Sequence, residues 1–250
     1  MVNNHIEYRR CCTSDIAVLK RLWPLCFTGD TTEEIDAFFE HIFPLSVAFA
    51  AFDGDTAVTM LYLLPAQVRG DGWSASVWYL YAGGTHPSYR SQGHYRRLMN
   101  AARDWACVSQ AVAIYLRPAD EGLFQYYASL GYVQPILTYP ANQSARIGDG
   151  RRISIDEYLD RRESSLSPSV LSWEPIRPII SHFVDGDGCA VADGAGVCRL
   201  IDHAVVREQI PLPMDIIGEH VAALWIPTTD DVATVDLMKR GISYSLFFGE

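Results

Sequence analysis

The sequence predicts an α+β fold, in which a mixed, mostly antiparallel central sheet is flanked by helices and followed by a smaller C-terminal α+β part. Three observations carry this prediction. Residues 46–84 contain three apolar runs separated by Asp/Gly turns, a pattern typical of an antiparallel meander. Helical stretches with an apolar stripe precede and follow this meander. A polar segment at 140–153 then precedes a second set of helical and β-rich runs.

The elements of the first half follow in order. Residues 5–9 alternate weakly between apolar and polar and predict a first strand. The stretches 14–15 and 31–34 carry the polar and acidic residues of helix starts, and apolar residues follow each at helical spacing. We expect the three strands of the meander at 46–52, 56–68 and 73–84.

After a further helix, the short β-rich run at 112–117 is spaced to lie parallel to the strand at 77–84, with that helix as the crossover. A helix is expected at 119–130, with Gly131 as the candidate for its C-terminal cap. A strand at 132–139 completes this part. For the second part we expect a helix at 154–163, a hairpin within 188–201, a helix at 214–224 and a terminal strand at 243–248.

Length and composition are those of a globular protein. The chain has 250 residues, of which 49% are apolar and 20% charged, enough for a sizeable core. Its net charge of −10 argues against nucleic acid as the main partner, because phosphate neutralisation needs clustered Lys and Arg.

The longest apolar stretch, 57–66, is too short to span a bilayer. Residues 1–5 lack the features of a signal peptide. We therefore expect a cytoplasmic protein with no membrane partner, and a homo-oligomer is left open.

The six cysteines show no CxxC or Cys/His ligand spacing, so we expect reduced thiols and no metal.

The most informative stretch runs from Thr85 to Met99, between an apolar strand and a helix. Such a corner directs free backbone N–H groups at one point, and the helix dipole adds positive potential there. It is a ready site for a phosphate or pyrophosphate. Four arginines gather in this part of an otherwise acidic chain, at positions 90, 96, 97 and 103. A solvated helix face is the alternative explanation, but their position at the helix start favours an anion contact.

Two motifs resemble the GNAT superfamily of acyl-CoA-dependent N-acyltransferases. The superfamily's coenzyme A loop, V-x-P-x-x-R/Q-x-x-G-x-G/A, is similar to Thr85-x-Pro87-x-x-Arg90-x-x-Gly93-x-Tyr95. The later Y-x-x-x-G-F/Y motif is similar to 127–132, Tyr-Ala-Ser-Leu-Gly-Tyr. The sequence departs from the first motif at two positions: Thr85 replaces the usual valine and Tyr95 replaces the final glycine or alanine.

The resemblance implies a GNAT-type α/β fold and acetyl-CoA as the co-substrate. It implies an N-acyltransferase domain at 1–145 and a C-terminal α+β domain at 146–250. The order of elements after residue 150 is distantly similar to two-part bacterial acetyltransferases, of which the enhanced-intracellular-survival type of aminoglycoside acetyltransferase is a larger relative. The implied function is transfer of an acetyl group from acetyl-CoA to a primary amine of an unidentified, small-molecule or peptide acceptor, by direct transfer in a ternary complex.

The resemblance also assigns residues to coenzyme A. The loop would bind the pyrophosphate through its backbone N–H groups, and the preceding strand end would pair with the pantetheine arm. The two adjacent glycines of that strand end indicate either a close neighbour or a simple bulge. The predicted coenzyme-binding residues are Gly83, Gly84, Thr85, Arg90, Ser91, Gln92, Gly93, His94, Tyr95 and Arg96.

Two catalytic residues are predicted. Tyr127 is the expected general acid that protonates the leaving thiolate, with its neighbour Tyr126 as a competitor, since only one of two adjacent helical residues is expected to face the site. The strand at 73–84 carries no Asp or Glu to act as a general base. A water chain is one substitute. The other follows from the resemblance: in the enhanced-intracellular-survival type the terminal carboxylate enters the active site, which here is that of Glu250.

The acceptor is expected over the two early helices and the meander. An acidic, aromatic-lined mouth there would suit a cationic amine. Its candidate residues are Phe27, Phe39, Phe43, Trp73, Trp78, Asp30, Glu33, Glu34 and Glu40. The alternative function is a non-catalytic GNAT-fold protein that binds acyl-CoA or serves as an interaction module.

Overall fold

We describe the protein from a computed structural model. It describes residues 6–70, 73–132, 134–138, 151–165, 170–172, 177, 189–192, 198–202, 205–210 and 220–229. The predicted terminal strand at 243–248 and the candidate base Glu250 lie outside these residues.

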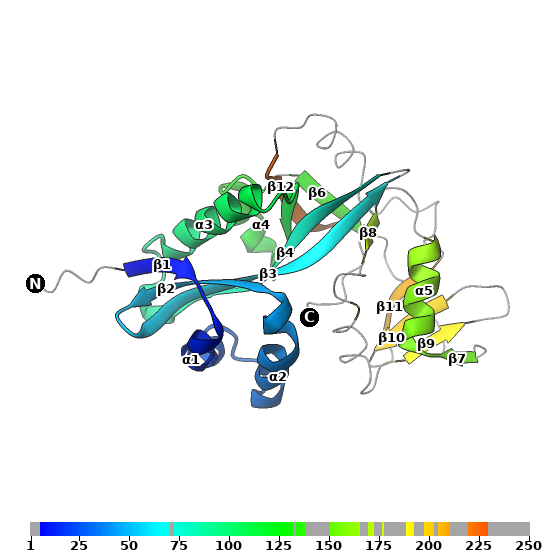
Figure 1. Cartoon of the computed structure of the whole chain (residues 1–250), viewed down its shortest axis with the longest axis horizontal. Coiled ribbons are helices and arrows are strands. Elements are labelled where there is room, and N and C mark those ends of the chain that lie inside the picture. Colours follow the sequence, from blue (N-terminus) through cyan, green and yellow to red (C-terminus); the bar gives the residue numbers. More distant parts are fainter. Residues whose placement is uncertain are drawn as a thin grey trace, which may run out of the picture.

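The first sheet has eight strands, in the order β1-β2-β3-β4-β5-β12-β6, with β8 pairing to β3 (Figure 1). All its pairs are antiparallel except β4 with β5, which are parallel as predicted. The fold is therefore the mixed, mostly antiparallel sheet that the sequence indicates. The strands are β1 (Ile6–Arg10), β2 (Val47–Asp53), β3 (Thr56–Gly70), β4 (Trp73–Thr85), β5 (Ala113–Leu116), β6 (Gln134–Thr138), β8 (Val170–Ser172) and β12 (His220–Pro227).

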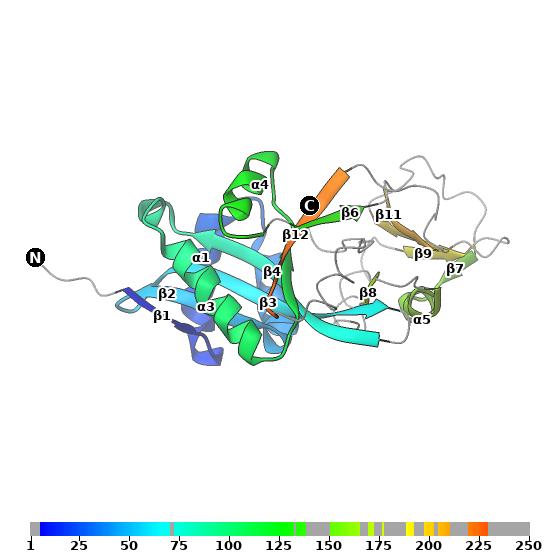
Figure 2. The same cartoon turned by 90° about the horizontal axis from the view of Figure 1, so that it is seen from above.

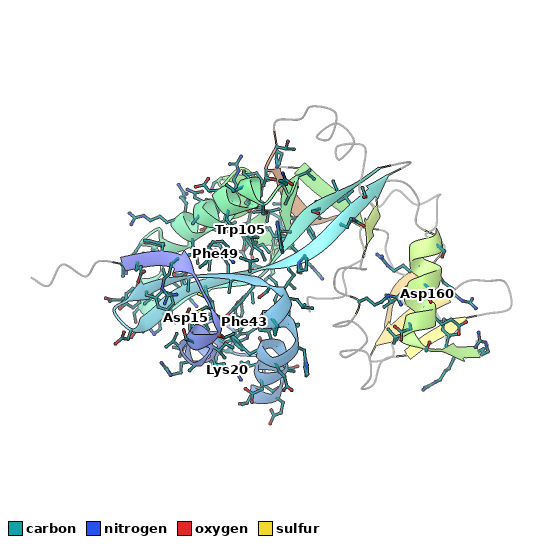
Figure 3. All side chains as sticks on the ribbon, viewed as in Figure 1. Asp15, Lys20, Phe43, Phe49, Trp105 and Asp160 are labelled. Carbon is teal, nitrogen blue, oxygen red and sulfur yellow. The ribbon has the colours of Figure 1, made fainter. Side chains whose placement is uncertain are left out.

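Helices cover both faces of this sheet (Figure 1). One face carries α1 (Ile16–Cys26) and α2 (Thr32–Ala37), which is continued by a π-helical turn and a 3-10 turn to residue 45. The other carries α3 (His94–Val108) and α4 (Glu121–Ala128). Figure 3 shows Phe43 on the first face and Phe49 with Trp105 on the second. Each face has its own buried cluster of apolar side chains, so the sheet is the centre of a three-layer core.

Local sequence signals fix the helix ends. The Thr31 side chain accepts the Glu34 N–H and the Glu34 carboxylate accepts the Thr31 N–H, so α2 begins with a capping box. The Asp120 side chain accepts the Leu123 N–H at the start of α4. The C-cap of α4 is Ser129, and Gly131 follows it two residues later with φ +95. The Tyr132 N–H donates to the Tyr127 carbonyl at 3.1 Å, so the left-handed glycine closes the end of the helix as predicted.

The parallel pairing of β4 with β5 is short, and this opens the sheet. It runs from Val77 opposite Ala113 to Leu80 opposite Leu116, where β5 ends. β4 continues for five more residues to Thr85, and no strand among the described residues pairs with it on that side. Its pairing with β3 is interrupted there by a bulge, at which Ala82 has φ +44. Figure 2 shows α3 and α4 emerging on either side of this opening.

A second sheet has four strands in the order β11-β10-β9-β7. Helix α5 (Ile155–Ser165) contacts this sheet and confirms the helix predicted at 154–163. The antiparallel pairing of β9 with β10 confirms the hairpin predicted within 188–201. The strands are β7 (Arg151–Ile153), β9 (Cys189–Ala192), β10 (Cys198–Asp202) and β11 (Val205–Ile210). The proposed domain boundary at residues 145/146 falls outside the described residues, so the division stays a proposal. Strands β8 and β12 return from the second part of the chain to the first sheet.

The prediction of a helix at 214–224 is wrong for residues 220–224, the part of it that the structure describes. Residues 220–227 form β12, which pairs antiparallel with both β5 and β6. A short apolar run does not distinguish a buried strand from a helix by its pattern alone. Pairing on both edges satisfies the backbone of this run within the sheet, which decides in favour of a strand. None of the helices in the described part of the chain is long and apolar enough to cross a membrane.

A two-pronged ion pair holds β1 to the start of α1. The Arg9 guanidinium donates from both terminal nitrogens to the two Asp15 carboxylate oxygens, each at 2.8 Å. The Cys12 N–H also donates to this carboxylate, at 2.9 Å. The hydrogen bonds from Arg9, with the smaller contribution of Cys12, lower the pKa of Asp15 to about 2, although its burial acts in the opposite direction. Figure 3 shows Asp15 below the sheet.

This ion pair predicts a pH-dependent stability. The pKa of Asp15 is lower in the folded chain than the ~3.9 of an unfolded chain, so its contribution is complete above about pH 4 and is lost as the pH falls towards 2. Because Arg9 is partly exposed, we expect Asp15→Asn to cost roughly 1–2 kcal/mol at pH 7 and progressively less below pH 4. Urea unfolding at pH 7, 5 and 3 measures this. The exposed Lys20–Asp36 pair provides the control. Asp36→Asn should cost at most about 0.5 kcal/mol at every pH. A difference between Asp15→Asn and the wild type that does not depend on pH would contradict the prediction.

Candidate active site

A cavity of about 810 Å³ opens where β4 extends beyond β5. Its walls come from the end of β4, the loop that follows, the first turn of α3 and one face of α4. The lining residues are Gly83, Gly84, Thr85, Tyr89, Arg90, Ser91, Gly93, His94, Tyr95, Arg96, Arg97, Leu123, Tyr126 and Tyr127. These include nine of the ten predicted coenzyme residues and the predicted acid Tyr127; Gln92 is not among them.

The loop presents backbone N–H groups to this cavity. Gly93 is the N-cap of α3, with φ +79, and provides no side-chain acceptor for the first turn. The N–H groups of His94, Tyr95 and Arg96 have no acceptor within the helix, because an α-helix leaves the donors of its first turn unpaired. Ser91 also has a left-handed backbone, with φ +62. Left-handed residues of this kind shape loops into concave anion sites.

The arginines of the basic cluster separate in the structure. Arg90, Arg96 and Arg97 line the cavity, whereas Arg103 does not. Nε of Arg90 donates to the Thr85 carbonyl at 3.2 Å, which ties the loop to the end of β4. The Arg97 guanidinium lies 5.9 Å from the centroid of the Tyr8 ring. The anion contact that the cluster suggests therefore rests on three arginines rather than four.

Gln92 lines a neighbouring cavity of about 650 Å³ on the β1 side of the loop. Its amide Nε2 donates to the Ser88 carbonyl at 3.1 Å, and its Oε1 lies 3.3 Å from His94 Nε2. His94 lines both cavities, and its Nδ1 lies 2.6 Å from the Tyr8 hydroxyl. Burial, with a smaller effect of Arg97, lowers the pKa of His94. The side chains of Gln92 and His94 thus brace the loop against β1 through these contacts.

The glycine pair in β4 fits both explanations that the sequence left open. The bulge is present, and each glycine also has a close neighbour. A Cβ on Gly83 would overlap the Tyr95 hydroxyl and lie 2.8 Å from Cζ of that ring. A Cβ on Gly84 would lie 2.7 Å from Cβ of Cys26, at the end of α1. The protein's own side chains, on opposite sides of β4, therefore require both glycines.

Tyr127 is largely buried on α4, and its hydroxyl lies 3.4 Å from the Tyr95 hydroxyl. Burial raises the pKa of Tyr127, and the hydrogen bond with Tyr95 acts in the opposite direction. The phenol is therefore protonated at neutral pH. This is the state that a general acid requires. Tyr127 is also one of the residues that line the cavity.

The expectation that only one of the two adjacent tyrosines faces the site is wrong. Tyr126 also lines the cavity, and its ring stacks against Tyr95 at 6.3 Å with an interplanar angle of 27°. Leu123, Tyr126 and Tyr127 lie at i, i+3 and i+4, so they share one face of α4. That spacing is visible in the sequence and could have identified all three residues by which α4 lines the cavity.

The acceptor side of the sheet is only partly as predicted. Phe39 and Phe43 are buried in the core. Trp78 lies on the other face of the sheet, with its ring 5.1 Å from that of Trp105. Phe27 approaches Gly84, with its Cζ 3.3 Å from where a Cβ on that glycine would lie. The Trp73 side chain lies outside the described part of the chain.

The charges of two predicted acidic residues act on Tyr81 of β4. Asp30 accepts the indole N–H of Trp23 at 2.6 Å. Burial raises the pKa of Tyr81 to about 12, and Asp30 and Glu34 add to this effect through their charge. Asp30, in the loop between α1 and α2, and Glu34, in the first turn of α2, therefore bring negative charge to the side of β4 on which Tyr81 lies.

A family model described as an acetyltransferase (GNAT) domain matches residues 7–134, which is more than half of the 250 residues. The chain belongs to the GNAT acetyltransferase family, as its motifs predict. A search of curated proteins found no significant match.

Solved structures share the fold at low sequence identity. One is a conserved Enterococcus faecalis protein of unknown function, described as a probable N-acyltransferase, with 15% identity, a TM-score of 0.61 and coverage of 78% of this chain and 54% of that chain. The GCN5-related N-acetyltransferase from Kribbella flavida has 13% identity, a TM-score of 0.59 and coverage of 94% and 67%. The one from Anabaena variabilis has 13% identity, a TM-score of 0.57 and coverage of 97% and 66%. The chain thus spans about half the length of the Enterococcus protein.

Proposed function

We propose that this protein is an N-acetyltransferase that moves an acetyl group from acetyl-CoA to a primary amine, by direct transfer in a ternary complex. One observation carries the proposal. A single cavity combines the first-turn N–H groups of α3, which have no acceptor within the helix, the bulged end of β4 and the Tyr127 hydroxyl. These are the parts that would bind a pyrophosphate, hold a thioester and protonate a leaving thiolate.

The loop and the first turn of α3 would bind the pyrophosphate of acetyl-CoA. Backbone donors and the helix dipole favour an anion there, and Arg90, Arg96 and Arg97 add positive charge. The pantetheine arm would then extend along the end of β4 beside the Tyr95 ring, which stands between the β4 bulge and α4. This arrangement would place the thioester carbonyl near the bulge and the sulfur near Tyr127.

The neutral amine would attack the thioester carbonyl carbon to form a tetrahedral intermediate. As the intermediate collapses, the C–S bond breaks and Tyr127 gives its proton to the leaving thiolate. The amine nitrogen loses a proton to water, and a proton from water then restores the Tyr127 phenol. At the ordinary pKa values, transfer from a phenol of pKa ~10 to a thiolate whose conjugate acid has pKa ~8.5 costs about 2 kcal/mol. Burial raises the pKa of Tyr127 and adds to this cost. The burial of Tyr127 keeps the phenol protonated until that step.

We further propose that the acceptor is a cationic amine. The acceptor would approach from the α1–α2 side of β4, where Asp30 and Glu34 lie close enough to raise the pKa of Tyr81. A second positive charge on the acceptor would be attracted to this pair of carboxylates, whereas a neutral substituent would not.

Thiol release from acetyl-CoA with matched amines tests both proposals. We expect release to depend on an amine, and a diamine to react roughly 10-fold more efficiently than a monoamine of equal length, as expected for one favourable charge contact. Asp30→Asn should remove most of that preference. Asp104→Asn, which removes an exposed carboxylate from α3 on the other face of the sheet, should leave it intact.

Two results would contradict these proposals separately. Acetyl-CoA binding without thiol release for any amine would favour the non-catalytic alternative. Release with equal efficiency for the diamine and the monoamine would refute only the cationic acceptor.

A further inference from the structure

Tyr95 reaches across the cavity to the bulge of β4. It stands in the first turn of α3, and its hydroxyl and ring edge occupy the space that a side chain on Gly83 would need. Any larger residue at position 83 would displace the ring, so the glycine and the tyrosine are a matched pair. The motif that this loop resembles has glycine or alanine at the position of Tyr95, which would leave that space open.

On its other side Tyr95 meets the aromatic wall of α4. Its hydroxyl is 3.4 Å from that of Tyr127, and its ring stacks against Tyr126. Tyr95 is therefore held between the strand bulge and the helix. Its position is fixed by packing on both sides, and a closely packed aromatic ring gives way to an added group only at a cost.

This position is where the acyl group of the donor would lie. A sulfur that receives the Tyr127 proton must lie within hydrogen-bond reach of the Tyr127 hydroxyl, and the Tyr95 hydroxyl is only 3.4 Å from that atom. The carbonyl carbon is one bond from the sulfur. An acyl chain that extends from that carbon along the β4 bulge meets the Tyr95 ring within a few methylene groups.

We infer that Tyr95 limits the donor to a short acyl group, so that acetyl is accepted and longer straight chains are excluded. This inference rests on the proposed function and adds to it the residue that sets the length of the acyl group. Its physical basis is steric. The Tyr95 ring fills the space that a longer acyl chain needs, and the missing side chain of Gly83 leaves room for the ring.

The test is a series of straight-chain acyl-CoA donors, acetyl, butyryl and hexanoyl, against the wild type, Tyr95→Phe, Tyr95→Leu and Tyr95→Ala. Binding is measured by titration calorimetry and turnover by thiol release with one amine. We expect the wild type to bind and use hexanoyl-CoA at least roughly 10-fold less well than acetyl-CoA, as steric exclusion from a packed site allows. Tyr95→Phe keeps the ring and should keep this preference. Tyr95→Ala should reduce it to about threefold or less, with Tyr95→Leu between the two.

Binding of unacylated CoA distinguishes a failure of the proposed function from a failure of the inference about Tyr95. If CoA itself does not bind to the wild type, the proposed function fails. If CoA binds equally to the wild type and to Tyr95→Ala, but both discriminate among the acyl chains to the same extent, only the inference about Tyr95 fails. Because CoA binding also reports a folded site, a variant that has lost its structure is recognised, and Tyr95→Leu, which leaves a smaller void, then decides the question.

Discussion

Tyr127→Phe should lower kcat by roughly 100-fold or more, since a positioned general acid contributes about 10²–10⁴ to the rate. The substitution removes one hydroxyl and keeps the ring that packs in the core of the α3–α4 face. Acetyl-CoA should still bind with a dissociation constant within about twofold of the wild type, because the phenol acts on the leaving group and not on ground-state binding. Stopped-flow thiol release and calorimetry measure the two quantities separately.

Tyr132→Phe is the matched control for that prediction. Tyr132 is 2% exposed in the same core cluster, and its ring lies 6.2 Å from the Tyr127 ring. Its hydroxyl has no hydrogen-bond partner among the described residues and does not line the cavity. Its removal should therefore leave kcat within about threefold, since it forfeits no hydrogen bond. Equal kcat values for Tyr127→Phe and the wild type would exclude Tyr127 as the acid.

Gly93→Val should weaken acetyl-CoA binding by roughly 10-fold or more. A non-glycine residue in the left-handed region costs about 1–2 kcal/mol, and about 1.4 kcal/mol corresponds to a factor of ten in affinity. Gly93 has φ +79, and an added Cβ would meet no protein atom within 4 Å. The loss would therefore come from the loop leaving its ligand-binding conformation and from the side chain standing in front of the helix N-terminus.

Gly54→Val separates the two contributions. Gly54, in the turn between β2 and β3, also has a positive φ, +58, and open space around its missing Cβ. It carries the same backbone penalty without lining either of the two cavities described above. Both variants should lose a similar amount of thermal stability, but only Gly93→Val should lose acetyl-CoA binding. Equal acetyl-CoA affinities in the two variants would mean that the loop does not hold the coenzyme.

Much of this site was predictable because its residues are close together in the sequence. The strand, the loop and the helix start at 77–99 form one continuous segment, so the spacing of Pro87, Arg90 and Gly93 already specifies the corner. The same holds for Tyr127 and Gly131, whose spacing places the candidate acid in the last turn of α4 and the left-handed glycine just beyond that helix. Local backbone preferences, such as the left-handed glycine at 93, determine this geometry directly.

Features set by distant contacts were not predictable in the same way. The run at 220–227 resembles a helix as much as a strand, and only its pairing with β5 and β6 decides. The glycine at 83 was attributed to a ligand or a bulge, because its match with Tyr95 depends on how α3 packs beside β4. The sequence does not indicate which face of the sheet each aromatic residue of the predicted acceptor mouth occupies, and Trp78 lies on the opposite face.

The central claim is that the cavity between the end of β4 and α4 binds acetyl-CoA. Calorimetric titration of the purified protein with acetyl-CoA tests it most directly. We expect one site per chain with a dissociation constant of roughly 1–100 µM, the lower part of the range usual for enzyme substrates, and displacement of the bound ligand by CoA. Absence of saturable binding at millimolar acetyl-CoA, by a protein shown to be folded, would contradict it.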